Sequence, residues 1–300
     1  MLVNGCDCSI VIKTTHNEMG IPYSDETLRE AVTLLEEEAA IEGNGICRSI
    51  RKSVGIAGCV ISPLTIENAP LLLYLAMGSA GLPEFVSETM NLYRNDLDLV
   101  PMEDTDLFNL IQARTNRNEQ LKMNSERKLY EGCRVKGFEL RILRDEVVKL
   151  KLNITGEWPP VAYQYQKAQC QSTKLNDTVI GNERFHGDYV IYKINGQEFK
   201  NIYGITLVSK KEGGTKTELW IKRALEESHD LPQIISEFTI TAKLLRDKYE
   251  ERHVGQFRIT LKKLVLATDE TNINTADTVI GPLRYYVAGK VTVEVFNNDH

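Results

Sequence analysis

The stretch Val148–Ile154, VKLKLNI, places apolar and polar side chains strictly by turns. Val148, Leu150, Leu152 and Ile154 alternate with Lys149, Lys151 and Asn153. Successive side chains of a β-strand point to opposite faces, so this pattern predicts a strand with one buried face and one wetted face.

Similar signals on both sides of this stretch make the predicted fold mainly β. Asn195-Gly196 is a strong hairpin signal, and it lies between the apolar runs Tyr189–Ile194 and Glu198–Val208. Further strands are predicted at Ile46–Ile66, within Gly81–Pro101, and at Phe108–Thr115, Cys133–Ile142, Leu219–Ile221, Phe238–Leu244, Phe257–Leu261 and Val287–Phe296.

Two or three helices are expected among these strands. Leu28, Val32, Leu35 and Ala39 recur at helical spacing, which predicts a helix over Ser24–Ile41. Asn68 followed by Pro70 predicts the start of a short buried helix that ends at Met77. A further short helix is predicted to begin at Pro232.

Composition shifts suggest how the chain is organised. We expect an N-terminal arm and helix over residues 1–45, a β region over 46–160, a linker or surface insertion over 161–187, and a second β region over 188–300. The two β regions are expected to form one composite domain. The polar stretch 114–129 is predicted to be an exposed loop or hairpin tip.

The composition is that of an ordinary globular protein. The 300 residues are 42% hydrophobic and 26% charged, which excludes a largely disordered or fibrous chain. The net charge of −6 argues against general coating of nucleic acid, because neutralising phosphates requires an excess of cations. The most apolar window, Ala69–Met77, is far shorter than the about 20 residues that span a bilayer, and Met1–Ile12 lacks a signal-peptide pattern.

No motif in the sequence predicts a catalytic, cofactor or metal site. Serine lies in no Gly-x-Ser-x-Gly elbow, and Gly43-Asn44-Gly45 and Gly213-Gly214-Thr215-Lys216 are incomplete as phosphate loops. The acidic pairs Asp96/Asp98 and Asp104/Asp106 lack the glycine and terminal glutamate of a calcium loop. We therefore expect no enzyme activity and no cofactor.

The six cysteines are expected to be reduced thiols. Cys6-x-Cys8 is half of a possible metal site, but no second ligand pair follows it. A Cys–His dyad assembled in space stays open as an alternative, because its partners need not be close in sequence. Its thiol candidates are Cys47, Cys59 and Cys133.

The order of segments resembles the tail tube proteins of long-tailed bacteriophages and phage-like particles. The segments that carry the resemblance are HNEMGIPYSDE (His16–Glu26), the strand, turn and helix of Cys47–Gly78, the glycine-led hairpin of Tyr130–Gly156, the later hairpin of Ile194–Gly214 and the strand pair of Glu237–Ala267. No one segment is diagnostic, and the specificity lies in their order and spacing. Residues 162–184 depart from the pattern.

The resemblance implies a β-barrel or sandwich of the tail-tube type with flanking helices. It also implies stacked, hexameric rings that form a hollow conduit for DNA delivery. The expected partners are copies of the chain, a tape-measure protein, the tail terminator and distal tail or baseplate proteins. DNA would be a passing cargo without sequence-specific binding, no membrane would be bound, and the location would be the virion tail, after assembly in the host bacterial cytoplasm.

A β-sandwich binding or adhesin module of a phage-like particle is the alternative function. It predicts clustered exposed aromatic residues, for which the sequence offers little sign, because Trp158 and Trp220 are far apart and the tyrosines form no stripe.

Overall fold

A computed structural model gives the fold of the chain. It describes residues 8–13, 18–37, 48–77, 84–85, 91–97, 108–114, 126–156, 161–162, 184–210, 216–224, 231–245, 253–269 and 279–297. The chain divides into two compact units, each assembled from three stretches. Unit 1 comprises Met1–Val60, Leu107–Val135 and Asn153–Gln169, and unit 2 comprises Ile61–Asp106, Lys136–Leu152 and Cys170–His300. These divisions differ from the boundaries expected at residues 45, 160 and 187.

The fold is mainly β, as the alternating patterns predict. Strands dominate the described residues, and the pairings that join them are antiparallel. The expected architecture was a β-barrel or a sandwich. The described strands are not closed into a barrel. The first strands are β1 (Cys8–Lys13), β2 (Glu18–Ile21), β3 (Asp25–Glu26), β4 (Arg29–Glu37) and β5 (Arg48–Pro63).

In unit 1, one group of strands is built around β1. β1 lies between β2 and β8 (Phe108–Arg114), and β8 pairs with the first part of β9 (Glu126–Leu143). β11 (Val161–Ala162) adds a short pairing to β9. The strand predicted at Phe108–Thr115 is thus confirmed over residues 108–114. Residues 126–129, predicted as part of a loop or hairpin tip, instead begin β9, and residues 115–125 lie outside the described residues.

The helix predicted over Ser24–Ile41 is wrong. Residues 29–37 form β4, which pairs antiparallel with β5 from Arg29↔Ala57 to Glu37↔Arg48. Helix propensity is a weak preference that a hydrogen-bonded neighbouring strand readily overrides. Residues 38–41 of the predicted helix lie outside the described residues.

Gly58 explains how the chain enters β4. A Cβ atom at Gly58 would lie 2.5 Å from the carbonyl oxygen of Thr27 and 2.7 Å from the amide nitrogen of Leu28. The Thr27 N–H also donates to the Cys59 carbonyl oxygen at 2.9 Å. Gly58 is therefore a place where a strand glycine allows a close approach of two backbone segments.

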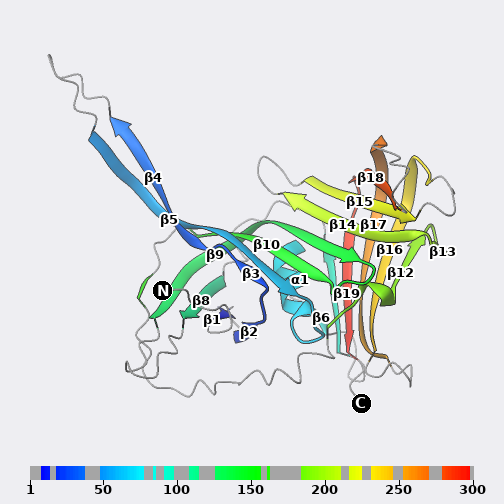
Figure 1. The fold of residues 1–300 in the computed structure, drawn as a ribbon, viewed down its shortest axis with the longest axis horizontal. Helices are drawn as coiled ribbons and strands as arrows, with labels where there is room; N and C mark the ends of the chain where they lie inside the picture. Colours follow the sequence, from blue (N-terminus) through cyan, green and yellow to red (C-terminus); the bar gives the residue numbers. More distant parts are fainter. Residues whose placement is uncertain are drawn as a thin grey trace. The chain divides into compact units, whose positions relative to one another are not determined.

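Unit 2 holds the larger group of strands. It contains the second part of β9, the first half of β10 (Lys149–Gly156), and β6 (Glu84–Phe85), β7 (Asn91–Leu97), β12 (Val190–Ile194), β13 (Gln197–Glu198), β14 (Ile202–Lys210), β15 (Lys216–Ala224), β16 (Ile234–Leu245), β17 (His253–Asp269), β18 (Val279–Val287) and β19 (Val291–Asn297). In Figure 1, β16, β17 and β19 run across the direction of β14 and β15.

Two ladders of unit 2 meet at β17. One ladder runs in the order β12–β16–β17–β19–β7, and the other in the order β9–β14–β15–β18–β17. β17 passes from one ladder to the other near Lys263, whose φ is +52°. At this point the turn between β18 and β19 contacts β17, because the Ala288 N–H donates to the Lys263 carbonyl oxygen at 2.9 Å.

Alternating residues from both ladders fill the core of unit 2. Leu140, Leu207, Leu219, Phe238, Ile259 and Tyr285 are fully buried. The predicted buried faces of β10, β16 and β17 are confirmed. β18, by contrast, was not predicted, because only its last residue fell within an expected strand.

The short helix predicted to end at Met77 is confirmed as α1 (Ala69–Met77), the single α-helix in the part of the chain that the structure describes. Asn68 precedes it, and its side chain accepts a hydrogen bond from the Thr65 N–H at 2.8 Å. The helix predicted to begin at Pro232 is wrong, because β16 already begins at Ile234.

The Asn195-Gly196 hairpin is confirmed, but its second strand is shorter than expected. Asn195 and Gly196 have φ values of +50° and +84°, as a type I′ turn requires. β13 pairs with β12 over only two residues, and β14 then leaves to pair with β9 and β15. The main partner of β12 is β16.

Candidate interaction surface

The outward side of β9, β14, β15 and β18 carries the most distinctive arrangement of polar and aromatic groups among the described residues. Along β14 and β15 every second side chain is buried, so the intervening side chains form one partly exposed surface, here called the outer face. Directly paired residues point to the same side of a sheet, so the strand register orders this face into rows.

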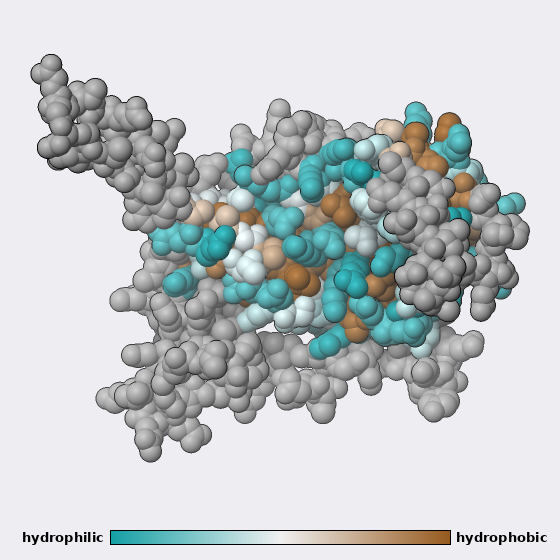
Figure 2. Space-filling view, turned by 45° about the horizontal axis from the view of Figure 1, so that its top comes forward, coloured by the Kyte–Doolittle hydropathy of each residue, from teal (hydrophilic) through white to brown (hydrophobic). Residues whose placement is uncertain are grey.

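Two rows cross the four strands. The first is Arg141–Thr206–Trp220–Arg284, and the second is Glu139–Val208–Glu218–Tyr286. The second row continues onto β17 and β16 through the pairings of Tyr286 with Val265 and of Val265 with Ile234. Ile234 is 66% exposed and Val265 43% exposed, so this row ends in solvent-facing apolar side chains. In Figure 2, hydrophobic residues lie interspersed among hydrophilic ones on the visible surface.

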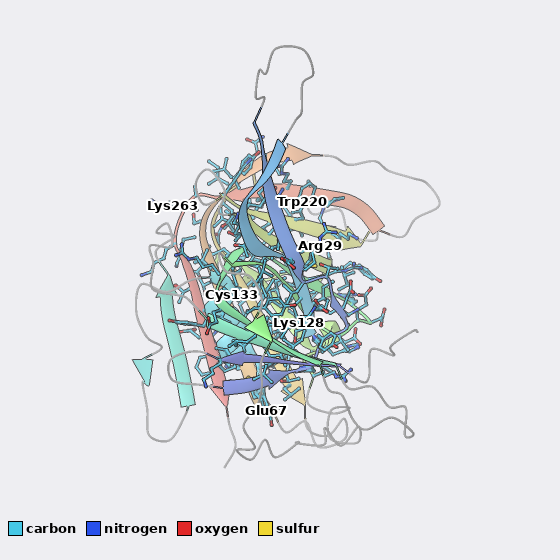
Figure 3. The ribbon with its side chains drawn as sticks, turned by 90° about the vertical axis from the view of Figure 1, so that its left-hand side faces the viewer. Arg29, Glu67, Lys128, Cys133, Trp220 and Lys263 are labelled. Atoms are coloured by element: carbon cyan, nitrogen blue, oxygen red, sulfur yellow. The ribbon has the colours of Figure 1, made fainter. Side chains whose placement is uncertain are left out.

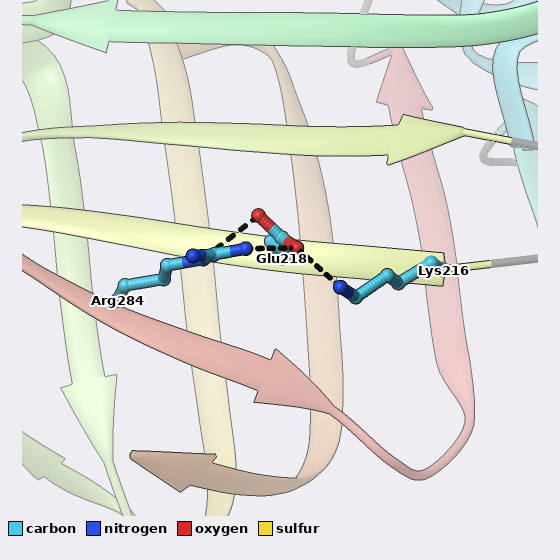
Figure 4. A network of polar contacts seen from close by, with 3 residues as sticks. All are labelled: Lys216, Glu218 and Arg284. Carbon is cyan, nitrogen blue, oxygen red and sulfur yellow. Dashed lines mark hydrogen bonds and ion pairs between the residues drawn. The ribbon is translucent and has the colours of Figure 1, made fainter. Parts of the chain in front are cut away.

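A network of ion pairs joins the two rows (Figure 4). Arg284 donates to Glu218 from Nε at 3.0 Å and from Nη2 at 2.6 Å. Lys216 Nζ lies 3.3 Å from the same carboxylate. The Glu218 side chain is only 15% exposed. The hydrogen bonds from Arg284, with a smaller contribution from Lys216, hold the pKa of Glu218 below its usual range.

The lowered pKa of Glu218 predicts a pH-dependent contribution to stability. A group whose pKa is lowered by folding stabilises the folded state above its unfolded pKa, about 4.3 for glutamate, and loses this effect as the pH falls through its folded pKa. We expect Glu218→Gln to lower the free energy of unfolding by about 1 kcal/mol at pH 7. The loss should shrink as the pH falls below about 4, because the wild-type carboxylate is then protonated.

Urea denaturation of wild type and variant from pH 7 to pH 3 measures this difference. Glu198→Gln is the matched control, since Glu198 is an exposed strand carboxylate of the same unit. A difference for Glu218→Gln that stays constant across this range would contradict the role given to the ion pairs.

Aromatic rings flank the ion pairs on both sides. The Arg284 guanidinium carbon lies 5.1 Å from the ring centre of Trp220 and 5.2 Å from that of Tyr286. Lys216 Nζ lies 4.7 Å above the Tyr286 ring. Because Glu218 fixes the guanidinium that contacts both rings, the two aromatic side chains are held in place before any ligand arrives.

A shallow hollow of about 350 Å³ opens on the same face. Thr206, Val208 and Trp220 contribute to its lining from the middle of β14 and β15, and Lys210, Lys222 and Pro282 contribute from farther along the strands. The carboxylates of Glu139 and Glu218 also border it. The hollow thus combines apolar and aromatic surface with charged groups of both signs, as small-ligand sites often do.

Sequence reasoning did not find this cluster. Strand alternation could have placed Trp220 on an outward face, but Tyr286 and Arg284 belong to β18, which the sequence did not predict. β15 and β18 come together only through a pairing of residues between 55 and 68 positions apart.

The cysteine candidates for a nucleophile find little support among the described residues. Cys133 lies on β9 (Figure 3) and is buried, and burial raises the pKa of its thiol to about 12, so the reactive thiolate is scarce at neutral pH. Cys59 Sγ lies 3.3 Å from Thr27 Oγ1. Cys6, Cys47 and Cys170 lie outside the described residues, as does the side chain of Cys8.

Two histidines belong to the described residues, although the side chain of His253 lies outside them. His186 Nδ1 lies 3.1 Å from Asp188 Oδ2, and His253 begins β17. Within the described ranges, no group of three or more His, Cys, Asp or Glu side chains is arranged to hold a metal ion. Asp98, Asp104, Asp106 and, except for Lys216, the incomplete phosphate loops lie outside those ranges.

No helix in the described part of the chain has both the length and the apolar character needed to cross a membrane. No known protein-family model matches the chain, and no curated protein matches it.

Proposed function

We propose that this chain is a structural subunit of a phage-type tail tube. In this proposal, copies assemble into rings, hexameric by analogy with the family, and the rings stack into a hollow conduit for DNA. The support is the order of sequence segments that resembles tail tube proteins, together with a mainly β, antiparallel fold. Such strands suit a wall that is dry on one side and wet on the other.

The observation that carries the proposal is a pair of sparsely covered edges on one ladder. In the order β12–β16–β17–β19–β7, the outer side of β12 is paired only with β13, over two residues. The outer side of β7 is paired only with β6, also over two residues. These statements hold for the described strands. Exposed edges are templates for pairing with another chain, and a closed ring leaves none of them free.

The remaining parts of the proposal follow from the same resemblance. The partners would be other copies of the chain, a tape-measure protein in the lumen, the tail terminator and the distal tail or baseplate proteins. DNA would pass through without sequence-specific binding, and the chain would carry no catalytic function. The location would be the virion tail, after assembly in the cytoplasm of the host bacterium.

Electron microscopy of the purified protein across a concentration series tests the proposal. Hollow rings or tubes of uniform width are the expected result. Assembly is also expected after addition of preformed tail-tip complexes if the protein alone is dispersed. Dispersed protein under both conditions would contradict the tube proposal.

A binding module is the second candidate function. It predicts clustered aromatic side chains, and the outer face brings Trp220 and Tyr286 to the two sides of Arg284, beside a hollow. This cluster is the specific observation that favours the second candidate. The two functions are compatible, because a tube subunit can carry a ligand site on a face that its ring contacts leave open.

A further inference from the structure

The hollow on the outer face has an apolar and aromatic middle. Trp220 is fixed on one side by the Arg284 guanidinium, and Val208 and Pro282 add aliphatic surface to the lining. A rigid indole beside aliphatic carbon suits a ligand with flat, weakly polar C–H faces and hydroxyl groups around its rim. Sugar rings have this chemistry.

Two lysines lie toward opposite ends of the hollow. Lys222 is paired with Gly204, and Lys210 lies farther along the same strand as Gly204, so their rows are about 20 Å apart at the usual rise of a strand. Both lysines line the hollow, and neither forms an ion pair with another described residue. Lys216 and Arg284, by contrast, are already engaged by Glu218.

The polar side chains that border the hollow favour some classes of anionic ligand over others. Glu139 and Glu218 border the hollow and would repel the closely spaced charges of a polyphosphate more strongly than carboxylates that are a whole sugar ring apart. The same carboxylates can accept hydrogen bonds from sugar hydroxyls, and the Thr206 hydroxyl can both donate and accept them. A peptide strand is disfavoured because this is the face of a sheet, where backbone groups are already paired with neighbouring strands.

We propose that this hollow binds a short acidic oligosaccharide, whose rings pack on Trp220 and whose carboxylates pair with Lys210 and Lys222. Glu218 and Arg284 act as positioning residues that hold the indole. This inference names the ligand class of the binding-module candidate and rests on that candidate, and it is independent of tube assembly.

Titration with trigalacturonate tests the inference, with maltotriose as a neutral probe and tripolyphosphate as an anion without rings. The chain has two tryptophans, so Trp158→Phe leaves Trp220 as the single indole reporter. We expect a saturable change in Trp220 fluorescence with trigalacturonate that weakens as salt is raised. Maltotriose and tripolyphosphate should each bind at least tenfold more weakly.

The variants identify the site. Lys210→Met and Lys222→Met should each weaken trigalacturonate binding about tenfold, as expected for one charge-assisted contact. Trp220→Phe, followed by calorimetry, should also weaken it. Glu218→Gln tests the positioning role separately, because loss of the Arg284 contact should change the Trp220 fluorescence of the Trp158→Phe protein before any ligand is added. Lys193→Met, an exposed strand lysine outside the hollow, is the control and should bind as the wild type does.

The possible failures are distinguishable. Equal binding of maltotriose would overturn the acidic ligand class but keep the binding module. Equal binding of tripolyphosphate would show a plain anion site and overturn the role of the rings. Absence of binding by all three probes would overturn the inference. Electron microscopy of the same preparations tests tube assembly separately.

Discussion

Leu150→Asp is expected to destabilise the protein by about 4 kcal/mol, the largest effect of any substitution considered. The Leu150 side chain is fully buried on β10, between the outward-facing Lys149 and Lys151. The substitution removes packed methyl groups and places a carboxylate where no water can reach it. A loss of this size is a large part of the about 5–15 kcal/mol that holds a typical domain folded.

Two controls separate the causes of this loss. Asn153→Asp adds the same charge at an exposed position of the same strand and should change stability by less than about 0.5 kcal/mol. Leu150→Asn keeps the shape of the aspartate without its charge. Burial raises the pKa of an introduced carboxyl, so the gap between Leu150→Asp and Leu150→Asn should grow as the pH rises above about 4.

Urea denaturation monitored by circular dichroism provides the measurement. Wild-type stability in Leu150→Asp at neutral pH would show that the buried face of β10 is assigned to the wrong side. A gap between the aspartate and asparagine variants that is independent of pH would show that the carboxylate reaches solvent.

Gly187→Ala should be the second most damaging change, with a loss of about 3 kcal/mol. A Cβ atom at Gly187 would lie 1.8 Å from the Leu143 carbonyl oxygen and 2.5 Å from the carbonyl carbon, so the backbone must move. Overpacking against backbone atoms cannot be relieved by a change of rotamer. Gly187 is buried at the start of the 3-10 turn η2 (Gly187–Tyr189).

The loss of stability is large because Phe185, two residues before Gly187, is hydrogen-bonded and packed within the core. The Phe185 N–H donates to the Leu64 carbonyl oxygen at 3.0 Å, and its own carbonyl oxygen accepts the Val148 N–H at 2.8 Å. The Phe185 ring is fully buried and meets the Phe257 ring edge to face at 4.8 Å. A shift at Gly187 is therefore transmitted to the strand pairs that Phe185 connects.

Thermal unfolding of Gly187→Ala against Gly20→Ala measures this effect. Gly20 is exposed, and an added Cβ there meets no atom within 4 Å, so its variant should unfold close to the wild type. Equal unfolding temperatures for the two variants would contradict the close approach of Gly187 to Leu143.

Strand alternation is a local signal, so the sequence alone predicted much of the fold. Leu150, Phe238 and Ile259 are buried where period-two alternation placed them, and α1 ends where its apolar run ends. These predictions are confirmed because the burial of alternate side chains is encoded within a few consecutive residues. The expectation of no catalytic motif stays a prediction, because many candidate residues lie outside the described ranges.

Only the tertiary structure decided which strands meet. Residues 29–37 carry a helical spacing of apolar side chains, yet they form β4 because β5 supplies a complete backbone ladder. Trp220, Arg284 and Glu218 form a cluster because β15 pairs with β18, and nothing near either strand in sequence specifies that partner. A hydrogen-bonded ladder joins residues that are distant along the chain, so its register, and every site built across it, is fixed by the packing of the whole unit.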